Sequence, residues 1–227
     1  MKLRQLLLIA SLVCVSSTSF SQVVFYGGDA NGVDGLTSEE DGVVSQAMTY
    51  DNFTVGAGGW NVSDLGGIFA VTTGSNFASA RYEIRQGVSV GNGGSLIQTG
   101  VFSVSSSSVG SLFGRDLRDF TGSVSPFSLA AGNYWIGISL IDPGSVRSFV
   151  ATTSGVNGVG GPLNDGNSFL NSSTFAANFD DAGDFIIEDR TPDFAYRITA
   201  APVPEPATLG ALGMGALALL RRRKKVN

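Results

Sequence analysis

The sequence predicts an all-β fold: an antiparallel, jelly-roll-like sandwich of two sheets, with a signal helix before it and a short hydrophobic helix after it. Short segments in the middle of the chain alternate apolar and polar residues, as half-buried strands do, and turn-forming residues separate them. No stretch of that region sustains the apolar spacing of an amphipathic helix. Each end of the chain contains a short apolar run. We therefore divide the chain into a leader (1–21), a β-domain (22–201) and a tail (202–227).

The leader has the three-part layout of a secretory signal peptide. It begins with Lys2 and Arg4, continues with an apolar run (6–15) and ends in small polar residues. Ser19 and Ser21 are small residues at the −3 and −1 positions of a cleavage site, which predicts cleavage after Ser21. The alternative is an uncleaved N-terminal anchor, although the run is short for a permanent transmembrane helix.

Three segments of the β-domain show the alternation most clearly. Their apolar residues occupy every second position and are expected to face the core. These residues are Ala80, Tyr82 and Ile84; Tyr134, Ile136, Ile138 and Leu140; and Phe194, Tyr196 and Ile198. Five further segments are typical of strands: 43–55, 66–73, 95–104, 145–153 and 184–190.

Turn residues predict how some of these strands are connected. Residues 142–145 place Pro143 and Gly144 at the centre of a β-turn, which predicts a hairpin between the strands on either side. Asn92-Gly93 predicts a second tight turn. The polar, glycine-rich stretch 154–184 is expected to form loops at one rim of the sandwich.

The tail combines a proline-rich start, a short apolar stretch and a basic end. Pro202, Pro204 and Pro206 cannot continue a helix, and they predict an extended break after the folded domain. As a helix, residues 207–220 would span about 21 Å, which is short for a hydrocarbon core of roughly 30 Å. The basic end, like the basic start of the leader, is expected to stay in the cytoplasm, so residues 22–203 would lie outside. The basic residues are Arg221, Arg222, Arg223, Lys224 and Lys225.

This tail resembles the PEP-CTERM sorting signal. The resemblance rests on Pro204-Glu205-Pro206, the short apolar helix after it and the basic cluster at the end. It implies export through the general secretion machinery, a transient anchor in the inner membrane through the C-terminal helix, and recognition by an exosortase that cuts near the Pro-Glu-Pro motif. It also implies a bacterium that makes extracellular polysaccharide, which makes that polymer a candidate partner. The alternative is an ordinary weak tail anchor.

Charge and missing residue types exclude several functions. Residues 22–203 contain eighteen acidic side chains and seven arginines, an excess of eleven negative charges, and all three lysines lie outside this range. Such a surface repels phosphate backbones, so we expect no nucleic-acid binding. The chain has no histidine, and its one cysteine, Cys14, lies in the leader. We therefore expect no catalytic residues, because the domain lacks the usual general base and any thiol nucleophile.

Two acidic clusters are candidates for calcium binding, since calcium takes about six to eight oxygen ligands. The first contains Asp29, Asn31 and Asp34, and the second contains Asp180, Asp181 and Asp184. The first does not match the EF-hand spacing, because Val33 lies where a ligand is due. The alternative for both is a solvated acidic loop. We expect no other cofactor.

Aromatic residues offer a candidate platform for a sugar ring. They are Trp60, Trp135, Tyr26, Tyr50, Tyr82 and Tyr134. The alternative is packing in the core, because aromatic side chains usually bury large areas. Paired carboxylates could hydrolyse glycosides, but nothing in the sequence pairs Glu83 or Glu188 with a second carboxylate.

The two terminal signals and the missing catalytic chemistry together predict an exported, non-enzymatic protein. Its expected role is structural or adhesive, at the cell surface or in the extracellular matrix of a biofilm. The alternative is a calcium-assisted carbohydrate-binding module associated with exopolysaccharide. A carboxylate-based hydrolase is a third hypothesis, since the fold alone does not determine function.

Overall fold

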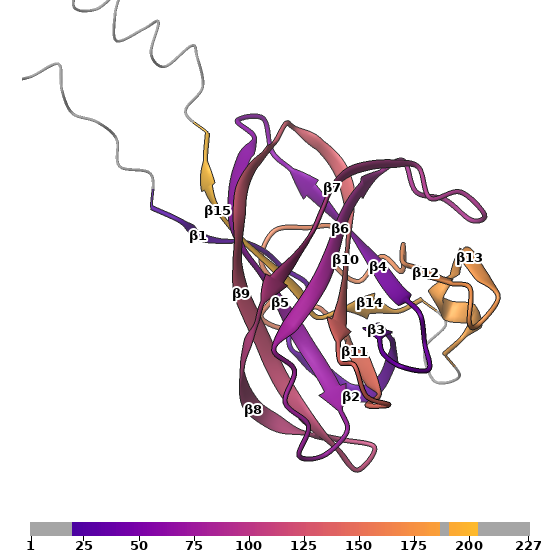
Figure 1. Cartoon of the computed structure of the whole chain (residues 1–227). Helices are drawn as coiled ribbons and strands as arrows, with labels where there is room; N and C mark the ends of the chain where they lie inside the picture. The colour runs from indigo at the N-terminus through magenta and orange to yellow at the C-terminus, as the bar shows by residue number, and fades with distance from the viewer. Residues whose placement is uncertain (1–19, 187–190, 204–227) are drawn as a thin grey trace, which may run out of the picture.

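Two β-sheets packed against each other form the part of the chain that the computed structural model describes, residues 20–186 and 191–203 (Figure 1). The predicted all-β sandwich is therefore confirmed. The predicted signal helix and hydrophobic tail helix lie outside the described residues. Of the leader and the tail, the structure describes only residues 20–21 and 202–203. In these described ranges the only helical element is a single 3-10 turn, η1 (Ala182–Asp184).

The first sheet has eight strands, and we call it the β5 sheet after its central strand. Its order is β1-β15-β5-β11-β14, with β2 pairing with β11, and β9 pairing with both β5 and β8. All of these pairings are antiparallel. The strands are β1 (Gln22–Tyr26), β2 (Ala30–Thr37), β5 (Trp60–Val71), β8 (Ser105–Leu112), β9 (Arg115–Leu129), β11 (Ser148–Thr153), β14 (Asp193–Phe194) and β15 (Tyr196–Pro202).

The second sheet has seven strands, and we call it the β10 sheet. Its order is β13-β12-β4-β3-β10-β6-β7, and β4 also pairs directly with β10. The short strand β3 is parallel to β10, and the other pairings are antiparallel. The strands are β3 (Glu39–Glu40), β4 (Ala47–Val55), β6 (Ser79–Gln86), β7 (Ser95–Ser103), β10 (Gly132–Ile141), β12 (Phe169–Ser172) and β13 (Ala177–Asp181).

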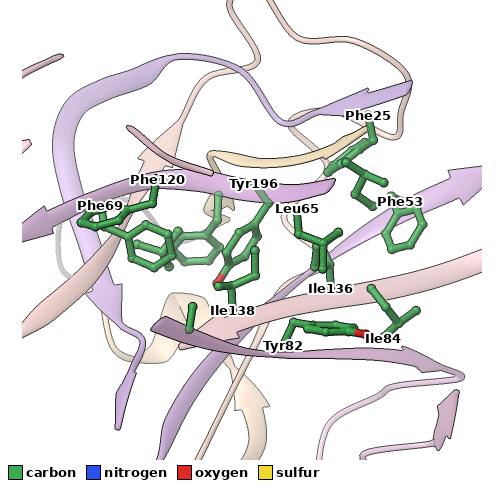
Figure 2. Close-up of a cluster of buried hydrophobic side chains, with 14 of the residues drawn as sticks. Phe25, Phe53, Leu65, Phe69, Tyr82, Ile84, Phe120, Ile136, Ile138 and Tyr196 are labelled. Atoms are coloured by element: carbon green, nitrogen blue, oxygen red, sulfur yellow. The ribbon is translucent and has the colours of Figure 1, made fainter. Parts of the chain in front are cut away.

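The core lies between the two sheets and is dominated by aromatic and β-branched side chains. Figure 2 shows Leu65 of β5 and Tyr196 of β15 near Ile136 and Ile138 of β10. Every alternating residue predicted to face the core, on β6, β10, β14 and β15, is buried. The Tyr196 hydroxyl also donates a hydrogen bond of 2.7 Å across the interface to the Thr49 carbonyl. Alternation therefore identified the buried faces of these strands correctly.

The predicted hairpin at residues 142–145 is wrong. Asp142 does accept the hydrogen bond expected in a tight turn, from the Gly144 N–H at 2.6 Å. The strands on either side, however, belong to different sheets: β10 pairs within the β10 sheet, and β11 pairs with β2, β5 and β14. The turn therefore carries the chain from one sheet to the other, because turn residues determine a local reversal and not the strand that pairs next.

The hairpin near Asn92 is present, but its turn lies two residues earlier than predicted. Ser89 and Asn92 exchange two backbone hydrogen bonds of 2.9 and 2.8 Å, which places Val90 and Gly91 at the centre. Gly91 has a φ of +73°, the left-handed region that glycine adopts at little cost. The Asn92 side chain instead accepts a hydrogen bond from the Gly94 N–H.

Residues 154–184 were expected to form loops. This prediction is wrong in part, because β12 and β13 form a hairpin within the stretch. The predicted strand 184–190 is also wrong for residues 184–186. There, Asp184 ends η1, which begins where the Asp181 carboxylate accepts a hydrogen bond from the Gly183 N–H at 2.9 Å. Residues 187–190 lie outside the described residues.

The first and last strands of the domain lie side by side. Gln22 at the start of β1 is in register with Ala200 near the end of β15. Because the two strands are antiparallel, the chain enters the domain beside the point where it leaves it (Figure 1). The predicted leader and tail therefore attach to the same end of the sandwich.

Candidate functional site

A groove of about 490 Å³ lies on the outer face of the β10 sheet. Two cross-strand pairs of β4 and β10 form its floor, Asn52 with Trp135 and Thr54 with Asn133. Their neighbours along each strand, Phe53 and Tyr134 among them, point into the core, so these four point outward. The loop that precedes β12 supplies the remaining wall through Pro162, Asp165 and Asn167.

Hydrogen bonds fix the loop against the sheet. The Asn52 amide donates to Asp165 Oδ2 at 3.0 Å, and the Trp135 indole N–H donates to the Asn167 carbonyl at 3.1 Å. The Thr54 hydroxyl donates to Asn133 Oδ1 at 2.8 Å. The groove is therefore shaped by polar contacts before any ligand arrives. One buried acceptor beside it, Asn52 Oδ1, has no hydrogen-bond partner within residues 20–186 and 191–203.

Two buried carboxylates lie near the groove: Asp193 holds its loop, and Asp51 links β4 to β14. The Asp193 carboxylate accepts hydrogen bonds from the backbone N–H groups of Asn164, Asp165 and Gly166. Asp51 accepts from the N–H groups of Phe194 and Asn52 at 2.7 and 2.9 Å. Burial raises the pKa of Asp51 well above its ordinary value, and the charge of Asp193 raises it further. Burial likewise raises the pKa of Asp193.

The first two residues of the tail, Pro202 and Val203, are still held by the β-domain. Pro202, the last residue of β15, is in register with Trp60 of β5, and the Val203 N–H donates to the Gly59 carbonyl at 3.3 Å. The sorting residues predicted from the sequence lie outside the described residues. They are Pro204, Glu205 and Pro206, and the basic residues Arg221 to Lys225.

Comparison with protein families decides what this tail is. A family model for the PEP-CTERM protein-sorting motif matches residues 202–224. The chain carries a PEP-CTERM sorting motif. The resemblance predicted from the sequence is therefore confirmed, and the motif supports an exported protein that an exosortase sorts and processes.

Two further comparisons found no relatives: no curated protein and no solved structure matches the chain. Across residues 20–186 and 191–203, no helix combines the length and apolarity needed to cross a membrane.

The residues of the first predicted calcium cluster form hydrogen bonds within the β-domain. Asp29 accepts from the Tyr26 hydroxyl and from the Asn157 amide, each at 2.7 Å. Asn31 accepts from the Thr152 hydroxyl at 2.8 Å, and Asp34 accepts from the Gly35 N–H at 2.7 Å. These contacts brace the region around β2 against β11 and the loop after it.

The second predicted calcium cluster lies at β13 and η1. Asp181 caps η1, Asp180 lies near the Asn178 N–H at 3.4 Å, and Asp184 is exposed. In the described part of the chain, no group of three or more acidic, histidine or cysteine side chains is positioned to hold a metal ion. Calcium binding stays a prediction.

Most of the aromatic residues predicted as a platform are packing residues. Tyr50, Tyr82 and Tyr134 are buried, and Trp60 stacks on Phe53 with ring centroids 5.8 Å apart. Trp135 also is largely buried, but it alone of the set lines the groove.

No local pattern in the sequence identifies the other groove residues. Asn52, Asn133 and Asp165 are far apart along the chain, and only the pairing of β4 with β10 and the fold of the loop bring them together. The lining contains amides, a hydroxyl and one carboxylate, together with Trp135, Phe53 and Pro162. It contains no basic side chain, so it suits a neutral ligand that has both hydrogen-bonding groups and an apolar face.

Proposed function

We propose that the protein is exported cargo: a non-enzymatic β-sandwich that is delivered to the cell surface or the extracellular matrix, where it has a structural or adhesive role. The sorting motif at residues 202–224 carries this proposal. The composition of the β-domain supports the non-enzymatic part, because residues 22–203 contain no histidine, lysine or cysteine to activate a nucleophile.

The placement of the chain ends supports delivery by way of a membrane. Because β1 and β15 are paired, a leader and a tail held in one membrane would attach to the same end of the sandwich. The opposite end, which includes the β8–β9 turn, would then face away from that membrane (Figure 1).

Alanine replacement of Pro204, Glu205 and Pro206 tests the sorting proposal. In cells that contain an exosortase, we expect the wild-type chain to lose its tail and the triple variant to keep it and remain in the membrane fraction. Replacing Val226 and Asn227 with alanine is the control, since both residues lie outside the matched range. Equal processing of the triple variant and the wild-type chain would contradict the proposal.

A second function, carbohydrate binding, is favoured by the groove on the β10 sheet. Amide and carboxylate groups can bind vicinal hydroxyls, and an indole can pack against the apolar face of a sugar ring. Asn52, Asn133, Trp135 and Asp165 place these groups in one groove without any basic side chain.

Calorimetry with the host's extracellular polysaccharide tests this second function, in the presence of calcium and of a chelator. We expect Asn133→Ala to weaken binding about tenfold, which corresponds to about 1.4 kcal/mol. Asn61→Ala is the matched control, because Asn61 is an exposed asparagine on β5, away from the groove. The absence of binding by the wild-type protein, or an equal loss in both variants, would refute the function. Loss of binding in the chelator alone would indicate that calcium takes part.

A further inference from the structure

Two consecutive edge strands of the sandwich carry no charge. Among the described strands, β7 pairs with β6 alone and β8 pairs with β9 alone, so they end the β10 sheet and the β5 sheet respectively. They follow each other in the chain, and residues 87–114, which contain both, include no acidic or basic side chain. An edge strand leaves a row of backbone N–H and C=O groups unpaired, and proteins usually protect such a row with charge or proline.

The other edge strands of the described domain have this protection. Each of β2, β13 and β14 contains at least one aspartate. The second half of β9, beyond its pairing with β8, contains Pro126, which cannot donate to a further strand. The uncharged strand β1 is short, and a bridge between Tyr26 and Val159 covers one end of it.

Strand β7 also exposes apolar side chains. Leu96 and Ile97 are more than 40% exposed, and Val101 is 55% exposed. Of the nine residues of β7 only Phe102 is buried, so the strand contributes little to the core that it borders. Its length and apolar surface make it a template for one more strand.

We propose that a second copy of this chain pairs with this edge, β7 against β7, in an antiparallel arrangement that extends the β10 sheet across both copies. The charge distribution identifies the partner. Residues 22–203 have an excess of eleven negative charges, so two copies repel each other over most of their surfaces. Along the uncharged edge they approach without bringing carboxylates together, and a two-fold axis lets the same strand pair with itself. The inference does not depend on where the protein is delivered.

Sedimentation velocity over a concentration series tests the pairing, with the natively processed protein purified from its host. We expect the wild-type protein to form dimers and Val101→Glu to weaken dimerisation at least about tenfold, because each copy would bring a new carboxylate to the shared, otherwise uncharged edge. Val101 is in register with Arg81 on β6, so the new carboxylate has a favourable neighbour within its own copy. Val43→Glu is the matched control, since Val43 is also an exposed valine and lies away from this edge, in the loop between β3 and β4.

Cysteine cross-linking separates loss of pairing from loss of folding. The only cysteine of the chain is Cys14, so a Cys14→Ser background allows a single thiol to be placed at will. We expect Val101→Cys to give a covalent dimer with a short cross-linker and Val43→Cys to give none. A wild-type protein that remains monomeric at every concentration would overturn the proposal. So would equal weakening by Val43→Glu, or equal cross-linking at both positions.

Discussion

Asp51 and Asp193 are buried acids that, among the described residues, form no ion pair. Through backbone hydrogen bonds Asp193 holds the loop of the groove and Asp51 links β4 to β14, but the pKa of each is raised, chiefly by burial. A raised pKa means that the folded state binds the proton more tightly than the unfolded state does. Protonation of these two acids therefore stabilises the folded state. This contribution is complete below the ordinary pKa of aspartate and is lost as the pH rises through the raised pKa of each acid.

We expect the stability advantage of the wild-type protein over Asp51→Asn to shrink as the pH rises from 4 to 7. The amide cannot titrate, and it costs about 1–3 kcal/mol at low pH because one N–H donor loses its acceptor. Chemical denaturation at several pH values measures the difference. Asp29→Asn is the control of opposite sign, because hydrogen bonds from Asn157 and Tyr26 lower the pKa of Asp29. A difference between wild type and Asp51→Asn that is independent of pH would contradict this assignment.

Single residues also show where the sequence misleads. Glu39 and Glu40 belong to the same acidic stretch as the predicted calcium ligands, yet they act as structural anions. The Glu39 side chain is fully buried and accepts a hydrogen bond of 2.6 Å from Arg147 Nε, and Glu40 pairs with Arg81 at 2.7 Å. Sequence spacing places these acids near one another but does not reveal that arginines from distant segments neutralise two of them.

At the scale of single elements, alternation predicts strands whose two faces differ in burial. β6 and β15 are such strands, and their core residues were predicted correctly; the core residues of β10 were also predicted correctly, although both of its faces are buried. β8 is a run of serines with one buried side chain, and β2 contains two glycines, so neither has the pattern of a strand. These two are strands because β9 and β11 pair with them, which is information that the local sequence does not hold.

The corner between β7 and β8 depends on Gly122 of β9. A Cβ atom at this position would lie 2.0 Å from the Ser103 carbonyl oxygen, closer than any real contact. We expect Gly122→Ala to destabilise the protein by about 1–3 kcal/mol, because the two backbones must move apart. Thermal and denaturant unfolding measure the loss.

Gly56→Ala is the control for that substitution, since nothing lies within 4 Å of its Cβ position and its φ is not in the left-handed region. We expect it to leave stability unchanged within about 0.5 kcal/mol. A Gly122→Ala variant as stable as Gly56→Ala would mean that the close approach of β9 to Ser103 is not needed for the fold.

At the scale of the whole molecule, periodicity and turn residues predicted the fold class, and the resemblance of the C-terminal segment to a PEP-CTERM signal predicted the sorting tail. Neither predicted the assignment of strands to sheets. The connection between β10 and β11 shows why: its turn residues are those of a hairpin, yet the chain crosses to the opposite sheet. The groove was missed for the same reason. Its residues come from β4, β10 and the loop before β12, and long-range pairing alone brings them together.

The central claim is that both ends of the chain are export and sorting signals and that the β-sandwich between them is the part that is delivered. The strands that adjoin these two ends, β1 and β15, are neighbours in one sheet. Intact mass spectrometry of the protein isolated from cells that make it tests the claim most directly. We expect a chain that begins near Gln22 and ends near Pro204. A full-length chain from Met1 to Asn227, recovered from the cytosol, would contradict it.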